Sequence, residues 1–304
     1  MNQVMTVLGP VPAAELGITL THEHLLLDLF QYFQPHREFL VNDRALAAQE
    51  LELYARAGGR TLVELTTPDI GRDPAGLAEI ARETGVNIVM GCGRYREPFY
   101  EPELWKRSTA DVAQMLIDEI EQGIDGVRPG IIGEIGTHDP WVSPVEERVF
   151  RASARAHKAT GLTITLHANA SAVGLRQLDV LAEEGVDLRR VVVGHCDTYP
   201  FSEYHRAVLE RGAWVEFDTI RGSFDFETKR QLDQLLLLIN EGHIGRLLLS
   251  QDVCTNRFYT VYGGNGYAFL ITEFVQQMLN AGLDREQIDT LLVENPRRML
   301  TGEE

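Results

Sequence analysis

Four histidines and two carboxylates follow short apolar segments of the chain. They are His22, His24, Glu134, His167, His195 and Asp252. Side chains two apart in an extended segment point the same way, so His22 and His24 of TLTHEHL are expected to converge while Glu23 turns aside. Glu134 lies in the apolar run GIIGEIG, where a buried carboxylate needs a partner. Imidazole and carboxylate together are ligands for divalent transition metals, so the pattern predicts a metal site.

The number of candidate ligands predicts two ions. A single catalytic ion keeps one position open for water and rarely takes six protein ligands. The expected division places His22, His24 and Asp252 on one ion and His167 and His195 on the other, with Glu134 and a hydroxide bridging them. Such a centre lowers the pKa of water and polarises an ester oxygen, while Asp252 serves as the catalytic acid–base group. The ligand types favour zinc, with manganese, iron or cobalt as alternatives.

Each of these residues also has a plain structural interpretation when taken alone. A His-x-His can be an ordinary polar strand end, and Glu134 can form a salt bridge in a barrel interior. All six residues, however, stand at the ends of five β-rich segments. That coincidence favours the metal centre.

Eight β-rich apolar segments recur along the chain. They are Ile18–Thr21, Thr61–Thr66, Asn87–Cys92, Gly130–Ile135, Leu162–Leu166, Arg190–Gly194, Ala213–Phe217 and Arg246–Ser250. Several are almost wholly apolar, as in VVVG and LLLS, which is typical of parallel strands covered on both faces. With helical segments between them, they predict one α/β domain over residues 1–304, a (β/α)8 TIM barrel with its site at the C-terminal strand ends.

Helix signals support this alternation. Ser143, Pro144 and Glu146 form a capping box with proline in the first turn, and Gly161 marks the end of that helix. We expect His157, in its last turn, to act there as a cation. A second helix is expected from about Thr109 to Glu121, and Asp43 is expected to begin another.

The composition of the chain restricts the classes of molecule that it is expected to bind. The 304-residue chain has a formal net charge of −17, which repels nucleic acid and anionic lipid and favours a small-molecule substrate. The N-terminus lacks a signal-peptide pattern and no apolar run has the length of a membrane span, so a cytoplasmic protein is expected. The three cysteines are too few and too scattered for a disulfide framework.

The motifs TLTHEHL, GIIGEIG, VVVGHCD, SQD and VENPRRML resemble the phosphotriesterase family of the amidohydrolase superfamily over nearly the whole chain. The resemblance implies a binuclear metal-dependent hydrolase whose ligands are the six positions already identified. Phosphotriesterases and the related lactonases bridge their ions with a carboxylated lysine where this chain has Glu134. The only lysines here, Lys106, Lys158 and Lys229, lie outside the strand ends, so the chain is more similar to the glutamate-bridged phosphotriesterase homology branch.

This resemblance implies hydrolysis of a lactone, ester or amide, with phosphotriester hydrolysis as the alternative, and a homodimer. A non-catalytic metal-binding barrel is less expected because every ligand position is filled. An aldolase or isomerase would call for a Schiff-base lysine or a phosphate-binding glycine loop, and the sequence has neither. We expect the physiological substrate to carry an anionic or strongly polar group.

Five residues near the strand ends are candidates for substrate binding. They are Tyr95, Arg94, Arg96, Arg221 and Arg257. The resemblance gives Tyr95 a place beside the metals, and the arginines could bind a carboxylate or phosphate, with surface ion pairs as the alternative. Glu216 and Asp218 are interpreted as loop residues rather than supports for a ligand histidine. The segment from Cys254 to Phe269 is expected to form a mobile loop.

Overall fold

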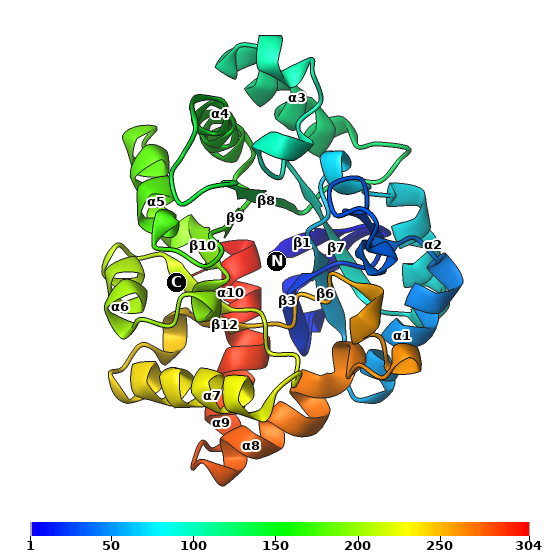
Figure 1. Ribbon diagram of the computed structural model, residues 1–304, viewed down its shortest axis with the longest axis vertical. Coiled ribbons are helices and arrows are strands. Elements are labelled where there is room, and N and C mark those ends of the chain that lie inside the picture. Colours follow the sequence, from blue (N-terminus) through cyan, green and yellow to red (C-terminus); the bar gives the residue numbers. More distant parts are fainter. Residues whose placement is uncertain (1, 304) are drawn as a thin grey trace.

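The computed structural model describes residues 2–303 and shows a parallel barrel inside a ring of helices (Figure 1). The barrel strands are β3 (Thr19–Glu23), β6 (Thr61–Glu64), β7 (Asn87–Cys92), β8 (Ile131–Gly136), β9 (Ile164–His167), β10 (Val191–Gly194), β11 (Trp214–Phe217) and β12 (Leu247–Leu249). They pair in sequence order from β3 to β12. All eight expected strands and the (β/α)8 class are therefore confirmed.

The barrel closes between its last and first strands through side-chain contacts. The Ser250 hydroxyl accepts a hydrogen bond from the His22 amide at 3.0 Å. It also lies within donating distance of the His22 carbonyl, at 2.9 Å, and of Glu23 Oε1, at 2.7 Å. The Asp252 amide donates to the same His22 carbonyl at 3.1 Å. The closure therefore lies directly beside two candidate metal ligands.

Helices cover the outside of the barrel. They are α1 (Arg44–Arg56), α2 (Pro74–Thr84), α3 (Thr109–Gln122), α4 (Pro144–Thr160), α5 (Val173–Glu183), α6 (Ser202–Glu210), α7 (Asp225–Asn240), α8 (Val275–Asn280), α9 (Arg285–Asp289) and α10 (Asn295–Thr301). The expected Ser143–Glu146 capping box is present, and Asp43 caps α1. His157 is not the expected cation, because burial lowers its pKa despite the opposing effect of the Leu162 carbonyl oxygen, which lies 2.6 Å from Nδ1.

Apolar side chains fill the N-terminal end of the barrel. The hairpin of β1 (Gln3–Thr6) and β2 (Gly9–Pro12) lies at this end, where the Val7 amide donates to the Ile88 carbonyl at 2.8 Å. Val4 of the hairpin and Met299 of α10 join one buried cluster with strand residues such as Trp214. The polar side chains are thus left to the opposite end.

Two segments shape that opposite end. Strands β4 (Leu27–Asp28) and β5 (Leu40–Val41) form a small antiparallel pair after β3. The segment after β12, which we expect to be a mobile loop, is bonded to the barrel at several points. Buried Glu50 accepts hydrogen bonds from Thr260 and Val261, and the Tyr267 hydroxyl donates to the His24 carbonyl at 2.6 Å. No helix within residues 2–303 has the length and apolar character to cross a membrane.

The closure generates a stability prediction. Ser250→Ala removes a buried hydroxyl and leaves the His22 amide without its acceptor, so we expect unfolding to become easier by about 1–3 kcal/mol. Chemical denaturation of the chelator-treated protein measures this change. Ser223→Ala, at an exposed position, is the matched control. An unchanged midpoint for Ser250→Ala would show that the hydroxyl does not contribute to closure.

Candidate metal centre

The barrel brings the predicted ligands together at its C-terminal end. Glu134 is the centre of the cluster, with its Oε2 2.8 Å from His167 Nδ1, 3.4 Å from His22 Nε2 and 3.5 Å from His195 Nε2. Its Oε1 lies 3.4 Å from His24 Nε2. Ligand atoms of His22, His24 and Glu134 lie within 4.8 Å of one another, and so do those of Glu134, His167 and His195. Two overlapping candidate metal groups therefore share Glu134.

The backbone is irregular where it presents these side chains. The strand register shifts between Leu20 and Glu23 on β3 and between Ile132 and Ile135 on β8, which is how a bulge re-aims a side chain. Gly133 has φ +126°, and a Cβ there would lie 2.4 Å from the Thr165 carbonyl oxygen. Only glycine therefore fits in front of Glu134.

The last two ligands leave their strands in the left-handed region. His195 has φ 58° and Asp252 has φ 45°, values that cost non-glycine residues free energy and that gather at functional sites. The sixth ligand position, Asp252, places Oδ1 3.4 Å from His24 Nε2. These conformations turn both side chains inward.

The donor atoms of the cluster fit divalent cations. His22 Nε2 is buried and has no hydrogen-bond partner among the described residues, although a buried ring nitrogen normally has one. His167 points Nδ1 at Glu134 and places Nε2 3.4 Å from the Tyr95 hydroxyl. A metal bound at His167 Nδ1 would require Nε2 to carry the ring proton, and Nε2–H would then donate to the Tyr95 oxygen. Each of these two rings thus has one nitrogen that could bind a metal.

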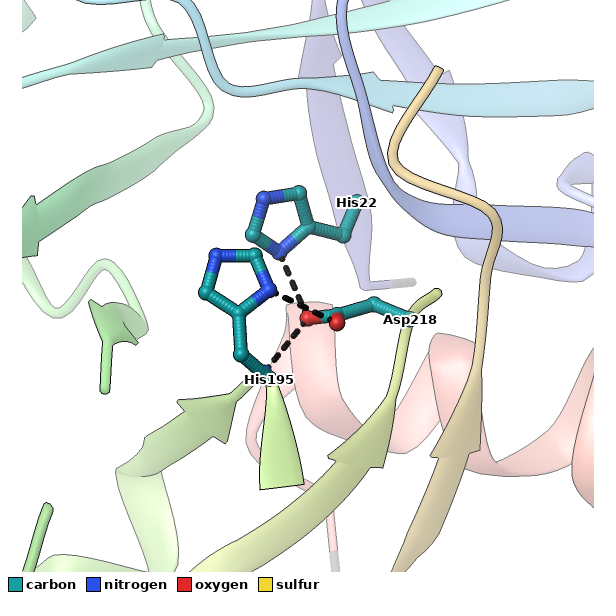
Figure 2. Close-up of side chains that lie close together, drawn as sticks. All are labelled: His22, His195 and Asp218. Carbon is teal, nitrogen blue, oxygen red and sulfur yellow. Dashed lines mark hydrogen bonds and ion pairs between the residues drawn. The ribbon is translucent and has the colours of Figure 1, made fainter. Parts of the chain in front are cut away.

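Asp218 supports two of the histidines (Figure 2). Its carboxylate lies 3.0 Å from His22 Nδ1 and 2.8 Å from His195 Nδ1, and it accepts the His195 amide at 2.8 Å. Glu216 Oε2 lies 3.3 Å from His22 Nδ1. Both acids are fully buried and contact Nδ1 of these histidines, which leaves Nε2 of each ring facing the centre. Our preference for a loop role over support of a ligand histidine is therefore wrong. Glu216 and Asp218 are two residues apart at the C-terminal end of β11, a spacing that puts two side chains on the same face of an extended segment. This spacing is the signal in the sequence that could have identified both acids as supports.

His24 has a comparable support on the neighbouring strand. Its Nδ1 lies 2.9 Å from the Thr66 hydroxyl, which donates in turn to Glu64 Oε1 at 2.6 Å. Glu64 also accepts the Leu25 amide at 3.1 Å. Sequence reasoning did not identify Thr66 or Glu64, since nothing in the motif around β6 resembles a ligand site.

The electrostatics of the cluster favour added positive charge. Burial lowers the pKa of a histidine, and at His167 it brings the pKa to about 4, yet carboxylates reverse this effect at His195 and His24. Asp218 helps to raise the pKa of His195 to about 10, and Asp252 with Glu134 raises that of His24 to about 9. Burial likewise opposes ionisation of Glu134, but His167 and His22 hold its pKa well below the usual value. Divalent cations would supply the charge that these carboxylates attract.

The cluster forms the floor of a pocket of about 280 Å³. One wall is apolar and comes largely from the β4–β5 segment. Its residues are Leu27, Leu29, Phe33, Phe39 and Ile70. The remaining lining contains Phe258 and is otherwise largely polar, with Tyr95, Arg96, Asn169, Arg221 and Arg257. The pocket therefore combines an apolar side with a cationic side above the candidate centre.

Four of the five predicted rim residues line this pocket, and Arg94 does not. Arg94 is buried, donates through Nε to Glu101 at 3.0 Å and through an Nη to the Gly93 carbonyl at 2.7 Å. These bonds hold the Arg94 side chain within the loop after β7, so Arg94 is not part of the proposed substrate site. Arg221 pairs with Asp252 Oδ2 and donates to the Gln251 carbonyl at 2.6 Å.

Comparison with known proteins agrees with this arrangement. Residues 2–300 match the Phosphotriesterase family. The phosphotriesterase homology protein of Escherichia coli K12 is 38% identical, covering 92% of this chain and 96% of the relative. The N-acetyltaurine hydrolase of Danio rerio is 30% identical, covering 99% of this chain and 98% of the relative.

Solved structures show the same fold. The Escherichia coli phosphotriesterase homology protein, with phosphate in its active site, superposes with a TM-score of 0.91 at 36% identity, covering 94% of this chain and 99% of that one. A lactonase from Listeria monocytogenes gives 0.91 at 26% identity, with coverage of 99% and 100%. The chain belongs to the phosphotriesterase family of metal-dependent hydrolases.

Proposed function

We propose that this hydrolase cleaves an acyl bond, in a lactone, ester or amide, and holds two divalent ions, zinc by ligand type. The observation that carries the proposal is the pair of candidate groups sharing Glu134, with the unpartnered His22 Nε2 between buried carboxylates. The ligands are His22, His24, Glu134, His167, His195 and Asp252. When bound, such ions lower the pKa of a coordinated water and polarise the oxygen of the scissile group.

The chain's own groups would orient the reaction. Asp252 Oδ1 faces His24, and Asp252 Oδ2 forms an ion pair with Arg221. One oxygen of the carboxylate therefore faces the pocket floor, while the ion pair at the other oxygen fixes its orientation. Burial alone would raise the pKa of the Asp252 carboxyl, but the charge of Arg221 opposes this effect and, with the bond to His24, holds the pKa below its usual value. Asp252 is therefore ionised and able to accept a proton from the attacking water.

Tyr95 is placed to bind the substrate carbonyl. Burial, followed by the charge of Glu134, raises the pKa of Tyr95 well above its usual value, so the phenol stays protonated. With a metal at His167 Nδ1, the Nε2–H of that ring would donate to the Tyr95 oxygen, 3.4 Å away, and the Tyr95 hydrogen would be free to point into the pocket. It can donate to the carbonyl oxygen as negative charge develops there.

The relatives and the pocket favour acyl substrates over phosphotriesters. Among similar proteins are N-acetyltaurine hydrolases, named for an amide substrate, and a lactonase. A phosphotriester is neutral and offers no anionic group to the arginines of the pocket. Phosphotriester hydrolysis is the second candidate, because the same centre could polarise a phosphoryl oxygen.

The first test concerns metal content. We expect wild-type protein to hold about two transition-metal ions per chain. Glu134→Gln removes the negative charge between two cations, so it should hold close to one and lose activity by more than about 100-fold. Elemental analysis with parallel assays measures both quantities. A fully active wild-type protein with a single ion would refute the binuclear centre.

The second test concerns Asp218. An asparagine there has one acceptor oxygen instead of two, and it cannot hold both Nδ1–H groups and the His195 amide. Asp218→Asn should therefore weaken metal affinity by about 10- to 100-fold, measured by competition with a chromogenic chelator. Asp197→Asn is the control, because buried Asp197 bonds Thr219 and Gln231 rather than a histidine. Equal losses in both variants would assign Asp218 a general folding role.

The third test is a substrate panel on the metal-loaded enzyme. It compares kcat/KM for lactones, aryl esters, N-acyl amines and neutral phosphotriesters. We expect an acyl compound to be the best substrate. Of the compounds in the panel, only an acyl compound can offer both a carbonyl oxygen to Tyr95 and an anionic group to the arginines of the pocket. A neutral phosphotriester turned over faster than every acyl compound would favour the alternative.

A further inference from the structure

The three arginines of the pocket differ in what they already bind. Arg221 is paired with Asp252 and bonded to the Gln251 carbonyl. Arg257 is exposed, and its guanidinium carbon lies 4.9 Å from the Phe258 ring centre. Arg96 is half-buried, and within residues 2–303 no carboxylate lies at ion-pair distance from it. Arg96 is therefore the pocket arginine that combines partial burial with an uncompensated charge.

Aromatic rings hold the Arg96 guanidinium in place. Its central carbon lies 4.9 Å from the ring centre of Tyr95, 5.4 Å from that of Phe99 and 6.0 Å from that of Tyr32. Phe99 also contacts both tyrosines, with ring centres 5.3 Å and 5.0 Å apart. Such rings stabilise the faces of a guanidinium but give its N–H groups no strong acceptor.

The hydrogen-bonding capacity of Arg96 is correspondingly unused. Its Nε is buried and has no hydrogen-bond partner among the described residues. A planar guanidinium presents parallel N–H donors that match the two oxygens of a carboxylate, a sulfonate or a phosphate. The cage thus fixes a donor group that lacks its acceptor.

Arg96 also lies at a useful position relative to the centre. Tyr95 contacts Arg96 with its ring and His167 with its hydroxyl, at 3.4 Å. A ligand held by Arg96 would therefore extend past Tyr95 toward Glu134 and the histidines on the pocket floor. The scissile carbonyl and the anionic group would be bound by adjacent residues of the chain.

We propose that Arg96 is the specificity-determining residue that binds an anionic group of the substrate, namely a carboxylate, sulfonate or phosphate joined by a short spacer to the acyl bond. This inference rests on the proposed acyl hydrolysis. Arg221 instead keeps Asp252 in position, and exposed Arg257 is screened by solvent and contributes less. The apolar wall of the pocket takes the part of the substrate that carries no charge.

The experiment compares matched N-acyl amines that differ only in a terminal sulfonate, carboxylate, phosphate or neutral carboxamide. Arg96→Met keeps an unbranched apolar side chain at this position and removes the donors. We expect it to lower kcat/KM for the anionic compounds by about 10- to 100-fold, mainly through KM, with little change for the carboxamide. Arg96→Lys, which keeps the charge without the planar fork, should recover part of the loss. The best anionic compound identifies which group the site prefers.

Arg257→Met is the control, and it should lower the anionic rates much less. Equal losses for the anionic and neutral compounds in Arg96→Met would overturn the proposal, as would unchanged anionic rates. If wild type hydrolyses no acyl compound, the proposed function fails separately. Calorimetric titration of metal-loaded protein with a short alkyl sulfonate then decides on Arg96: loss of binding in Arg96→Met supports the anion site, and binding equal to that of wild type overturns it.

Discussion

Buried carboxylates at the C-terminal end of the barrel impose the constraint on which the remaining structure depends. An ionised carboxylate removed from water is costly unless it is paired or hydrogen-bonded, and this end of the barrel contains several. Glu23 is bonded by the Ser250 hydroxyl and by the amides of Gln251 and Val253, although burial still raises its pKa to about 7. These bonds fix the loop that carries Asp252 against the first strand. The hydrogen bonds that stabilise the buried Glu23 carboxylate therefore also close the barrel.

The partners of the other acids form a second layer around the centre. Asp218 contacts the imidazoles of two histidines, and Glu64 accepts a hydrogen bond from the Thr66 hydroxyl. Asp252 forms an ion pair with Arg221. Glu134 differs because its side chain meets imidazole nitrogens from several sides. Those nitrogens are neutral ligands when they bind a metal, so a cation is the partner that satisfies both them and Glu134.

The sequence was sufficient for the parts of this protein that repeat a regular pattern. Apolar parallel strands have a clear signature, and polar residues directly after them converge because all eight strands run the same way. The supports were missed because their partners depend on three-dimensional register: Asp218 lies 23 residues from His195 and much farther from His22. Arg94 was misjudged for a related reason. It follows Cys92, where β7 ends, so the period-two rule no longer says which way its side chain points.

The division of labour among the arginines bears on how one barrel can serve different substrates. Arg221 is bound to Asp252, so a change there would disturb the groups that perform the chemistry. Arg96 lies among the aromatic rings of Tyr32, Tyr95 and Phe99. Within the described chain, no acid of the centre lies at ion-pair distance from it. Its replacement would remove an anion-binding group while leaving the supports of the histidines intact. Specificity can therefore change at the wall of the pocket without altering the floor, because Arg96 forms no ion pair, within the described residues, with the acids that support the histidines.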